Sequence, residues 1–307
     1  MKIIFMGTPE FAVPSLEILL KHYDVVAVVT QPDKPKGRGK KMAFSAVKER
    51  ALQAGIEVLQ PAKVKEKEFI QKLKTYNAEL IAVTAFGQIL PEEILNMPKY
   101  GCINVHGSLL PKYRGAAPLQ WSIINGEKQT GVTTMYMAKG MDTGDMLLKQ
   151  SITISQQDTY GSIHNKLSVI GAQLLLETIQ GLQNGTLQRI PQKEQEATYA
   201  PMITKETGHI DWSKKCDEII CLIHGLDPAP TAYTIYNGEM LKIWQAEKIE
   251  QNIGEVGEVT AVTKKGFVVT AGDGSIVITE VQAKGKKRMG ADAYLRGHSI
   301  AIGTILK

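Results

Sequence analysis

Short apolar runs alternate with longer amphipathic segments through the first half of the chain. Residues 2–6 and 24–30 are apolar and rich in β-branched side chains, which is typical of buried strands. Residues 12–21 between them have the spacing of a helix, with Pro14 in its first turn. The alternation continues with predicted strands at 80–84, 101–106, 130–137 and 145–154 and predicted helices at 45–54, 65–76 and 158–183. This order predicts an α/β fold, with a Rossmann-like, mostly parallel sheet and helices on both of its faces.

The pattern changes after Gly185. Residues 188–208 are polar and have no clear period, so they predict a linker. After a predicted helix at about 214–226, five short strands follow at close spacing, at 232–236, 240–246, 257–262, 266–271 and 276–281. Such strands predict a small OB-like β-barrel. The predicted domains are residues 1–187, the linker 188–208 and the barrel domain 209–307.

Composition narrows the class of protein. A hydrophobic fraction of 43% and a charged fraction of 22% are ordinary for a soluble globular chain. The three cysteines, Cys102, Cys216 and Cys221, are too scattered for a disulfide framework, so we expect reduced thiols in a cytoplasmic protein. No pair of them has the CxxC spacing of a zinc site, so no metal is predicted. The apolar runs are too short for a signal peptide or a membrane span, and no membrane partner is expected.

The net charge of +5 is modest, but the cations are concentrated. The segment from Lys34 to Lys41 contains five cations and no acid. Charge runs usually form solvated loops, yet this one leaves a predicted strand at the edge of the sheet where ligands bind. We therefore predict that it binds a phosphate backbone through Lys34, Lys36, Arg38, Lys40 and Lys41. A second basic cluster at 284–288 is equally compatible with nucleic-acid binding and with a solvated tail.

Asn104 and His106 stand two residues apart at a predicted strand end, so their side chains share one face. Singly, these residues and Asp142 in the Gly-rich loop 140–145 each have ordinary structural roles. Together they favour chemistry at a carbonyl group. Asn104 can donate a fixed hydrogen bond to a carbonyl oxygen, and His106 can donate to a developing oxyanion or exchange a proton. Asp142 can orient His106 and favour its charged form.

Two other kinds of site are disfavoured. The turn after the first strand is not a GxGxxG fingerprint, because Pro9 and Glu10 occupy positions that a pyrophosphate loop keeps small. No Ser, Cys or Thr lies in a nucleophile elbow, which favours direct transfer over a covalent enzyme intermediate. Arg114 can pair with a substrate anion or brace its own loop, and the sequence leaves both roles open.

Four segments closely resemble the methionyl-tRNA formyltransferase family, and the likeness runs nearly end to end. They are Cys102 to Pro118, the loop 141–145, Gln31-Pro32-Asp33 with the following Gly-Arg-Gly, and Ala85 to Pro91. The Asn-x-His pair, Ser-Leu-Leu-Pro and the Asp loop are shared by the wider 10-formyltetrahydrofolate-using family, whereas the basic loop with this C-terminal domain is more specific. The resemblance implies transfer of a formyl group from 10-formyltetrahydrofolate to the α-amine of methionine on initiator methionyl-tRNA.

The resemblance also implies roles for individual residues. Its catalytic positions are Asn104, His106 and Asp142, and its folate-binding positions are Ser108, Leu109, Leu110 and Pro111, with Phe86 and Gly87. Residues 31–41 fall on the loop that enters the acceptor end of the tRNA, and no stable protein partner is implied. One alternative is a related formyltransferase or hydrolase acting on a small amine or water, which needs no basic loop or barrel domain. Another is a tRNA-binding protein with an inert folate-like domain, which has no reason to keep all three polar residues.

Overall fold

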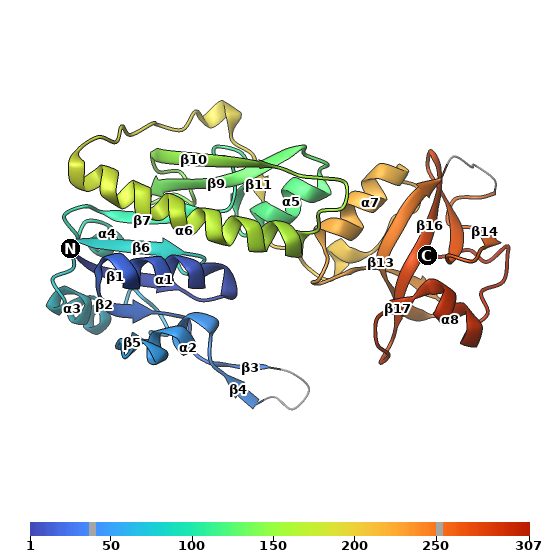
Figure 1. Cartoon of the computed structure of the whole chain (residues 1–307), viewed down its shortest axis with the longest axis horizontal. Helices are drawn as coiled ribbons and strands as arrows, with labels where there is room; N and C mark the ends of the chain where they lie inside the picture. Colours follow the sequence, from blue (N-terminus) through green and yellow to red (C-terminus); the bar gives the residue numbers. More distant parts are fainter. Residues whose placement is uncertain (37–40, 250–253) are drawn as a thin grey trace. The chain divides into compact units, whose positions relative to one another are not determined.

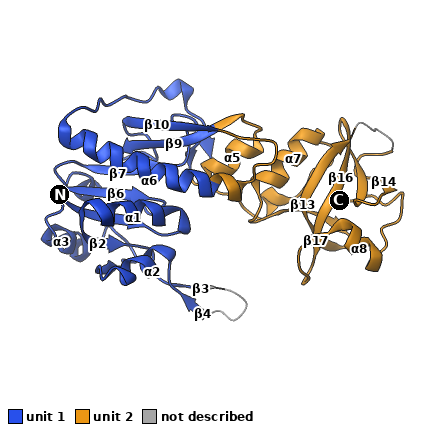
Figure 2. Ribbon diagram, in the orientation of Figure 1, with its two compact units in different colours: residues 1–115, 130–152, 164–200 blue, residues 116–129, 153–163, 201–307 orange. Residues whose placement is uncertain are grey.

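The computed structural model describes residues 1–36, 41–249 and 254–307 (Figure 1). The chain divides into two compact units, each with its own hydrophobic core (Figure 2). The first unit comprises residues 1–115, 130–152 and 164–200, and the second comprises residues 116–129, 153–163 and 201–307.

A seven-stranded sheet forms the centre of the first unit, in the order β10-β9-β7-β6-β1-β2-β5. Its strands are β1 (Lys2–Gly7), β2 (Asp24–Val29), β5 (Val58–Leu59), β6 (Leu80–Thr84), β7 (Cys102–His106), β9 (Gln129–Tyr136) and β10 (Met146–Thr153). The strands from β7 to β5 pair in parallel, and β9 runs antiparallel to β7. The sheet confirms the predicted Rossmann-like, mostly parallel class.

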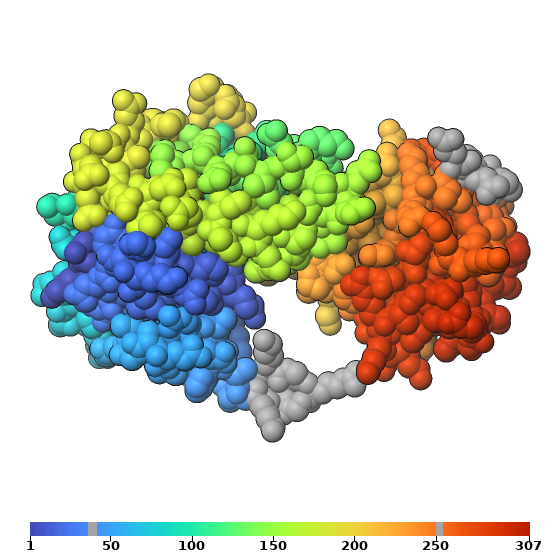
Figure 3. All heavy atoms as spheres, in the orientation of Figure 1, coloured from blue at the N-terminus to red at the C-terminus, as the bar shows by residue number. Residues whose placement is uncertain are grey.

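Helices cover both faces of this sheet, because successive side chains of each buried strand point to opposite sides. Ile3 and Phe5 of β1 pack in a cluster with side chains from α1 (Val13–His22), α2 (Ala46–Gln53) and α6 (Tyr160–Asn184). Ile4 and Met6 pack in another cluster with α3 (Lys67–Thr75) and α4 (Glu92–Leu95). The outer side of α6 forms part of the molecular surface (Figure 3). Val169 of this helix is exposed. A short 3-10 helix, η1 (Glu10–Ala12), precedes α1.

The polar segment that the sequence predicts as a linker contains several short elements. These are η2 (Glu194–Glu196), β11 (Tyr199–Ala200) and η3 (Glu206–Gly208). Strand β11 pairs in parallel with β8 (Arg114–Gly115), so this segment packs on the first unit as far as Ala200. Its composition indicated only a polar chain, because its partners lie far away in the sequence.

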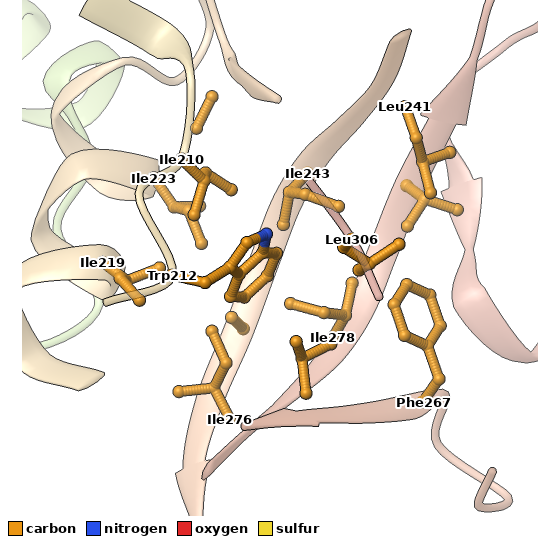
Figure 4. Close-up of a cluster of buried hydrophobic side chains, with 14 of the residues drawn as sticks. Ile210, Trp212, Ile219, Ile223, Leu241, Ile243, Phe267, Ile276, Ile278 and Leu306 are labelled. Atoms are coloured by element: carbon orange, nitrogen blue, oxygen red, sulfur yellow. The ribbon is translucent and has the colours of Figure 1, made fainter. Parts of the chain in front are cut away.

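The second unit is built on an antiparallel sheet in the order β12-β13-β16-β15-β14, with β17 beside β16. The strands are β12 (Ala232–Tyr236), β13 (Glu239–Ile249), β14 (Val259–Val262), β15 (Phe267–Ala271), β16 (Gly274–Ala283) and β17 (Met289–Gly290). The helices are α5 (Pro118–Ile124), α7 (Cys216–Gly225) and α8 (Ala291–Gly297). Buried side chains from the strands and α7 surround Trp212 (Figure 4).

The last residues of the chain connect the two outer strands of this sheet. The amide of Leu306 donates to the carbonyl of Gly257 (2.9 Å), just before β14. The amide of Ile235 in β12 donates to the carbonyl of Lys307 (2.6 Å). Thr234 Oγ1 also donates to that carbonyl (2.8 Å) and accepts from Trp212 Nε1 (3.1 Å). These contacts make the sheet a closed ring, in agreement with the predicted small barrel.

Candidate active site

The predicted catalytic pair lies on β7, next to the parallel strand β6. Ile103 and Val105 of β7 pack in the same cluster as Leu175 of α6. Asn104 and His106 therefore project from the opposite face, because side chains alternate along a strand. Both stand near the carboxyl ends of the parallel strands, the edge at which sheets of this kind bind ligands.

The imidazole of His106 is buried, with 5% of the residue exposed, and both of its nitrogens face oxygen atoms. Nε2 lies 3.0 Å from the carbonyl oxygen of Tyr113. A carbonyl oxygen only accepts hydrogen bonds, so Nε2 must carry a proton. Nδ1 lies 3.6 Å from Oδ2 of Asp142, which is longer than a hydrogen bond. Nδ1 is therefore the nitrogen left to gain or lose a proton.

Asp142 lies in the loop between β9 and β10 and has a backbone φ of +51°. That conformation is uncommon for a residue with a side chain, so contacts must hold it. Its Oδ2 accepts a hydrogen bond from the amide of Gly115 (2.9 Å), and its carbonyl accepts one from Gln192 Nε2 (2.7 Å). Gly144 in the same loop cannot carry a side chain, because an added Cβ would lie 1.8 Å from the carbonyl oxygen of Tyr136.

The carboxamide of Asn104 is half-buried and has no hydrogen-bond partner among the described residues. Its amide atoms are not among the buried polar atoms that lack a partner, so they are accessible from solvent. Its donors are therefore available to an oxygen atom of a bound molecule. This observation fits a carbonyl ligand at this edge of the sheet.

The predicted folate-binding segment forms a loop after β7 that is tied to β9. Thr133 Oγ1 donates to the carbonyl of Ser108 (2.7 Å) and accepts from the amide of Leu110 (3.2 Å). Ser108 and Leu110 are each 1% exposed, so their side chains support the loop from within. Leu109 and Pro111 are half-buried and have more surface to offer a ligand.

Phe86 and Gly87 belong to the loop after β6, which is tied to the loops after β1 and β2. The carbonyl of Phe86 accepts hydrogen bonds from Thr8 Oγ1 (3.1 Å) and Gln31 Nε2 (3.2 Å). The phenyl ring of Phe86 is buried, and Gly87 has a φ of +87°. Hydrogen bonds thus join the loops that follow three neighbouring strands, and they fix the backbone at this edge of the sheet.

The basic segment forms a short hairpin of β3 (Lys34–Lys36) and β4 (Lys41–Ala43), where its composition predicted a loop. The two arms pair antiparallel, and the ladder between them compensates for the low strand propensity of lysine and proline. Lys34 is exposed. Arg38 and Lys40 lie outside the described residues, as do the side chains of Lys36 and Lys41.

An ion pair anchors the base of this hairpin. Lys48 Nζ lies 2.6 Å from Oδ2 of Asp33, and Gln60 Nε2 donates to its Oδ1 (2.8 Å). The hydrogen bond from Lys48, followed by that from Gln60, lowers the pKa of the Asp33 carboxyl group. The hairpin therefore leaves β2 in a direction set by α2, which carries Lys48.

Several residues that hold the site have no signal in the local sequence. Tyr113 and Gly115 act through their backbone atoms, and Gln192 comes from the segment predicted as a linker. Arg114 is 1% exposed and pairs with Glu194 (2.8 Å), so in this structure it braces the chain. The roles predicted for Asn104, His106 and Asp142, and for the folate and tRNA contacts, stay predictions.

Within residues 1–36, 41–249 and 254–307, no cluster of three or more His, Cys, Asp or Glu side chains has the arrangement of a metal site. In the same residues no helix combines the length and the apolar character needed to cross a bilayer.

The fold and this site define an α/β enzyme whose polar groups meet at the carboxyl edge of a mostly parallel sheet. The chain matches the family "Formyl transferase" over residues 1–179 and "Formyl transferase, C-terminal domain" over residues 202–299. It belongs to the formyltransferase family, which confirms the resemblance read from the sequence, and it is an enzyme of formyl transfer.

Curated relatives match over the full chain. A methionyl-tRNA formyltransferase of Caldanaerobacter subterraneus subsp. tengcongensis is 57% identical over 309 residues and covers 100% of both chains. One from Acetivibrio thermocellus is 52% identical over 309 residues, covering 100% of this chain and 99% of the relative.

Solved structures share the fold at lower identity. The sugar 3N-formyl transferase WlaRD superposes with a TM-score of 0.68 at 24% identity, over 94% of this chain and 99% of that one. HypX from Aquifex aeolicus, solved with tetrahydrofolic acid, has a TM-score of 0.63 at 19% identity, over 96% of this chain and 47% of that one. These likenesses agree with the observed architecture.

Proposed function

We propose that this protein transfers the formyl group of 10-formyltetrahydrofolate to the α-amino group of methionine on initiator methionyl-tRNA. The observation that carries the proposal is the short distance, 3.6 Å, between His106 Nδ1 and the Asp142 carboxylate. The unpartnered amide of Asn104 lies on the same strand as His106. The choice of acceptor is supported by relatives of that name at 48–57% identity over the full chain. An enzyme with this acceptor works where translation begins, in the cytoplasm.

The folate substrate supplies the formyl group on its N10 atom. Asn104 donates an amide hydrogen bond to the formyl oxygen, and it needs no rearrangement because no described residue holds that amide. His106 in its charged form donates from Nδ1 to the same oxygen as negative charge develops there. Asn104 and His106 thus act on one atom from neighbouring positions of β7.

The carboxylate of Asp142 lies 3.6 Å from Nδ1, close enough to stabilise a positive charge on the imidazole during the reaction. The amide of Gly115 holds Oδ2 in place. The attacking amine must also lose a proton, and Asp142 is placed to take it directly or through a water molecule. The bond between the formyl carbon and N10 then breaks, and N10 of the folate gains a proton as tetrahydrofolate leaves. No nucleophilic side chain is needed, so the formyl group passes directly from donor to acceptor.

The folate donor lies against the loop of Ser108, Leu109, Leu110 and Pro111 and the loop of Phe86 and Gly87. Thr133 keeps the first loop in shape, and the contacts of Thr8 and Gln31 keep the second. Both loops present backbone groups, and the first adds the half-buried apolar surface of Leu109 and Pro111, which suits a flat, partly polar ring system.

The basic hairpin binds the acceptor end of the tRNA through Lys34, Lys36, Arg38, Lys40 and Lys41. Cations that neutralise phosphates release counter-ions from the nucleic acid, which favours binding. The barrel domain provides a second tRNA-binding surface, and no stable protein partner is required.

The test is an assay of purified protein with 10-formyltetrahydrofolate and charged initiator methionyl-tRNA. We expect formylmethionine, detected by mass spectrometry after the ester is hydrolysed. Free methionine methyl ester, an amino-sugar nucleotide and water serve as competing acceptors in parallel reactions. Faster transfer to a small amine, or faster release of formate than transfer to tRNA, would overturn the proposal.

A further inference from the structure

The polar segment Gln192–Thr198, named the strap here, contacts both loops that hold the His106–Asp142 pair. Its first residue, Gln192, contacts the Asp142 loop. Its last residue, Thr198, contacts the loop that carries the carbonyl partner of His106. Neither end belongs to the segments that resemble the family motifs, and neither has a role in the mechanism proposed above.

The amide of Gln192 can be oriented in only one way. Its Oε1 lies 3.0 Å from Arg114 Nε, and a guanidinium group can only donate. The NH₂ group must therefore face the other way, where it donates to the carbonyls of Asp142 (2.7 Å) and Gly144 (2.8 Å). Both donors of one side chain thus hold the loop whose Asp142 backbone has φ of +51°.

Arg114 keeps Gln192 in this orientation. The residue is 1% exposed, and its guanidinium group also donates to both carboxylate oxygens of Glu194, at 2.8 and 3.1 Å. The hydrogen bond from Arg114 lowers the pKa of Glu194, which therefore remains an anion at neutral pH. This ion pair joins a buried guanidinium group to an exposed carboxylate and restricts the Arg114 end of the contact with Gln192.

Thr198 fixes the second loop through three contacts. Its Oγ1 accepts from the amide of Tyr113 (2.9 Å), and its carbonyl accepts from the amide of Arg114 (2.8 Å). Its amide donates to the carbonyl of Pro111 (3.4 Å). The carbonyl of Tyr113 is the partner of His106 Nε2, so the strap contacts the two loops that hold His106 and Asp142.

We propose that Gln192 is a positioning residue for catalysis, which sets the place of the Asp142 carboxylate relative to His106. This inference rests on the proposed function. Formyl transfer needs the Asp142 carboxylate beside Nδ1 of His106. The Asp142 loop has a residue with positive φ and exposed neighbours, so further contacts are needed to hold its backbone in one position. Met141, for example, is 58% exposed. The Gly115 amide holds the end of the Asp142 side chain, and the two donors of Gln192 hold the backbone that carries it.

The decisive variant is Gln192→Glu. Glutamate keeps an oxygen for Arg114 but replaces both donors by an oxygen that repels the two carbonyls. We expect kcat for formyl transfer to fall by about tenfold or more, because displacements near 1 Å cost that much or more in a catalytic group. The KM values for both substrates should stay within about threefold, since Gln192 contacts neither substrate in the proposed mechanism. Gln195→Glu, the same change at an exposed position of the strap, should match wild type.

The alternative is that Gln192 only braces Arg114. That role predicts wild-type kcat for Gln192→Glu, because the contact to Arg114 is retained, and this result would overturn the proposal. If Gln192→Glu does not fold, the isosteric Gln192→Met replaces it and should show the same fall in kcat. A folded Gln192→Met with wild-type kcat would also overturn it. A wild-type protein without activity on methionyl-tRNA would instead overturn the proposed function, and this inference with it.

Discussion

The Nε2 atom of His106 lies 3.0 Å from the carbonyl oxygen of Tyr113, and this contact decides which ring nitrogen can change its protonation. Nε2 keeps its proton in both charge states, so Nδ1 is the atom that can exchange one. Nδ1 is also the atom that faces Asp142. The carbonyl of Tyr113, seven residues along the chain, therefore orients the imidazole so that Nδ1 faces the Asp142 carboxylate.

Removal of the imidazole tests the division between catalysis and tRNA binding. His106→Ala should lower kcat by about 10²–10⁴-fold, the usual contribution of a group that transfers or donates a proton. The Kd for initiator methionyl-tRNA, measured by filter binding, should stay near wild type. His22→Ala, at an exposed position of α1, is the matched control. Parallel loss of tRNA affinity in His106→Ala would contradict the assigned role.

Removal of the charge of Asp142 tests its action on His106. Asp142→Asn keeps an oxygen that can accept from the Gly115 amide, so the loop should retain its shape. The rate of formyl transfer should fall by about tenfold or more, because the imidazolium form loses its neighbouring anion. Asp24→Asn, at the exposed start of β2, should have no effect. A rate within about threefold of wild type would show that the carboxylate is not needed in this role.

The basic hairpin can be tested through salt dependence. Neutralisation of Arg38 and Lys40 together should raise the KM for tRNA and reduce the slope of log Kd against log salt by about one to two. The reason is that each lost phosphate contact releases one counter-ion fewer on binding. Lys65→Gln with Lys67→Gln removes two exposed cations elsewhere on the first unit and should leave the slope unchanged. An unaltered slope in the hairpin variant would exclude direct phosphate contacts.

The C-terminal segment that closes the barrel carries one side chain of the barrel core, Leu306. Leu306 is 3% exposed and belongs to the barrel core (Figure 4). Leu306→Ala should lower the free energy of unfolding of the second unit by about 2–5 kcal/mol, as for other buried leucines. Ile305→Ala, at a neighbouring position that is 43% exposed, should have a small effect. Calorimetry would measure both, and equal destabilisation would contradict the closed barrel.

The cysteines should be unreactive in the folded protein. Burial raises the pKa of Cys102 to about 12 and that of Cys216 to about 11. It also raises the pKa of Cys221. All three thiols are therefore protonated at pH 8, and the thiolate is the form that reacts. Iodoacetamide should give no rapid alkylation by mass spectrometry, and three alkyl groups after unfolding. Rapid modification of Cys102 in folded protein would be inconsistent with its buried place on β7.

Most of the fold was predictable because its elements have strong local patterns. The β12 strand was predicted at 232–236 and is observed there, and the helix α6 has nearly its predicted length. The β3–β4 hairpin was missed, because five cations with prolines and glycines carry no strand signal. The contact of β11 with β8 was missed for another reason. Two-residue strands have no periodicity, and only their partner identifies them.

The sequence by itself determined the α/β alternation, the barrel signature and the candidate group of Asn104, His106 and Asp142, because spacing and composition are local properties of a chain. Only the tertiary structure decided how that group is held. Gly115 and Asp142 are 27 residues apart, and Asp142 and Gln192 are 50 residues apart. Each contact joins a side chain to a backbone atom, and every residue has backbone atoms. A backbone partner of this kind cannot be recognised from residue types, because only folding brings it within hydrogen-bond distance of the side chain.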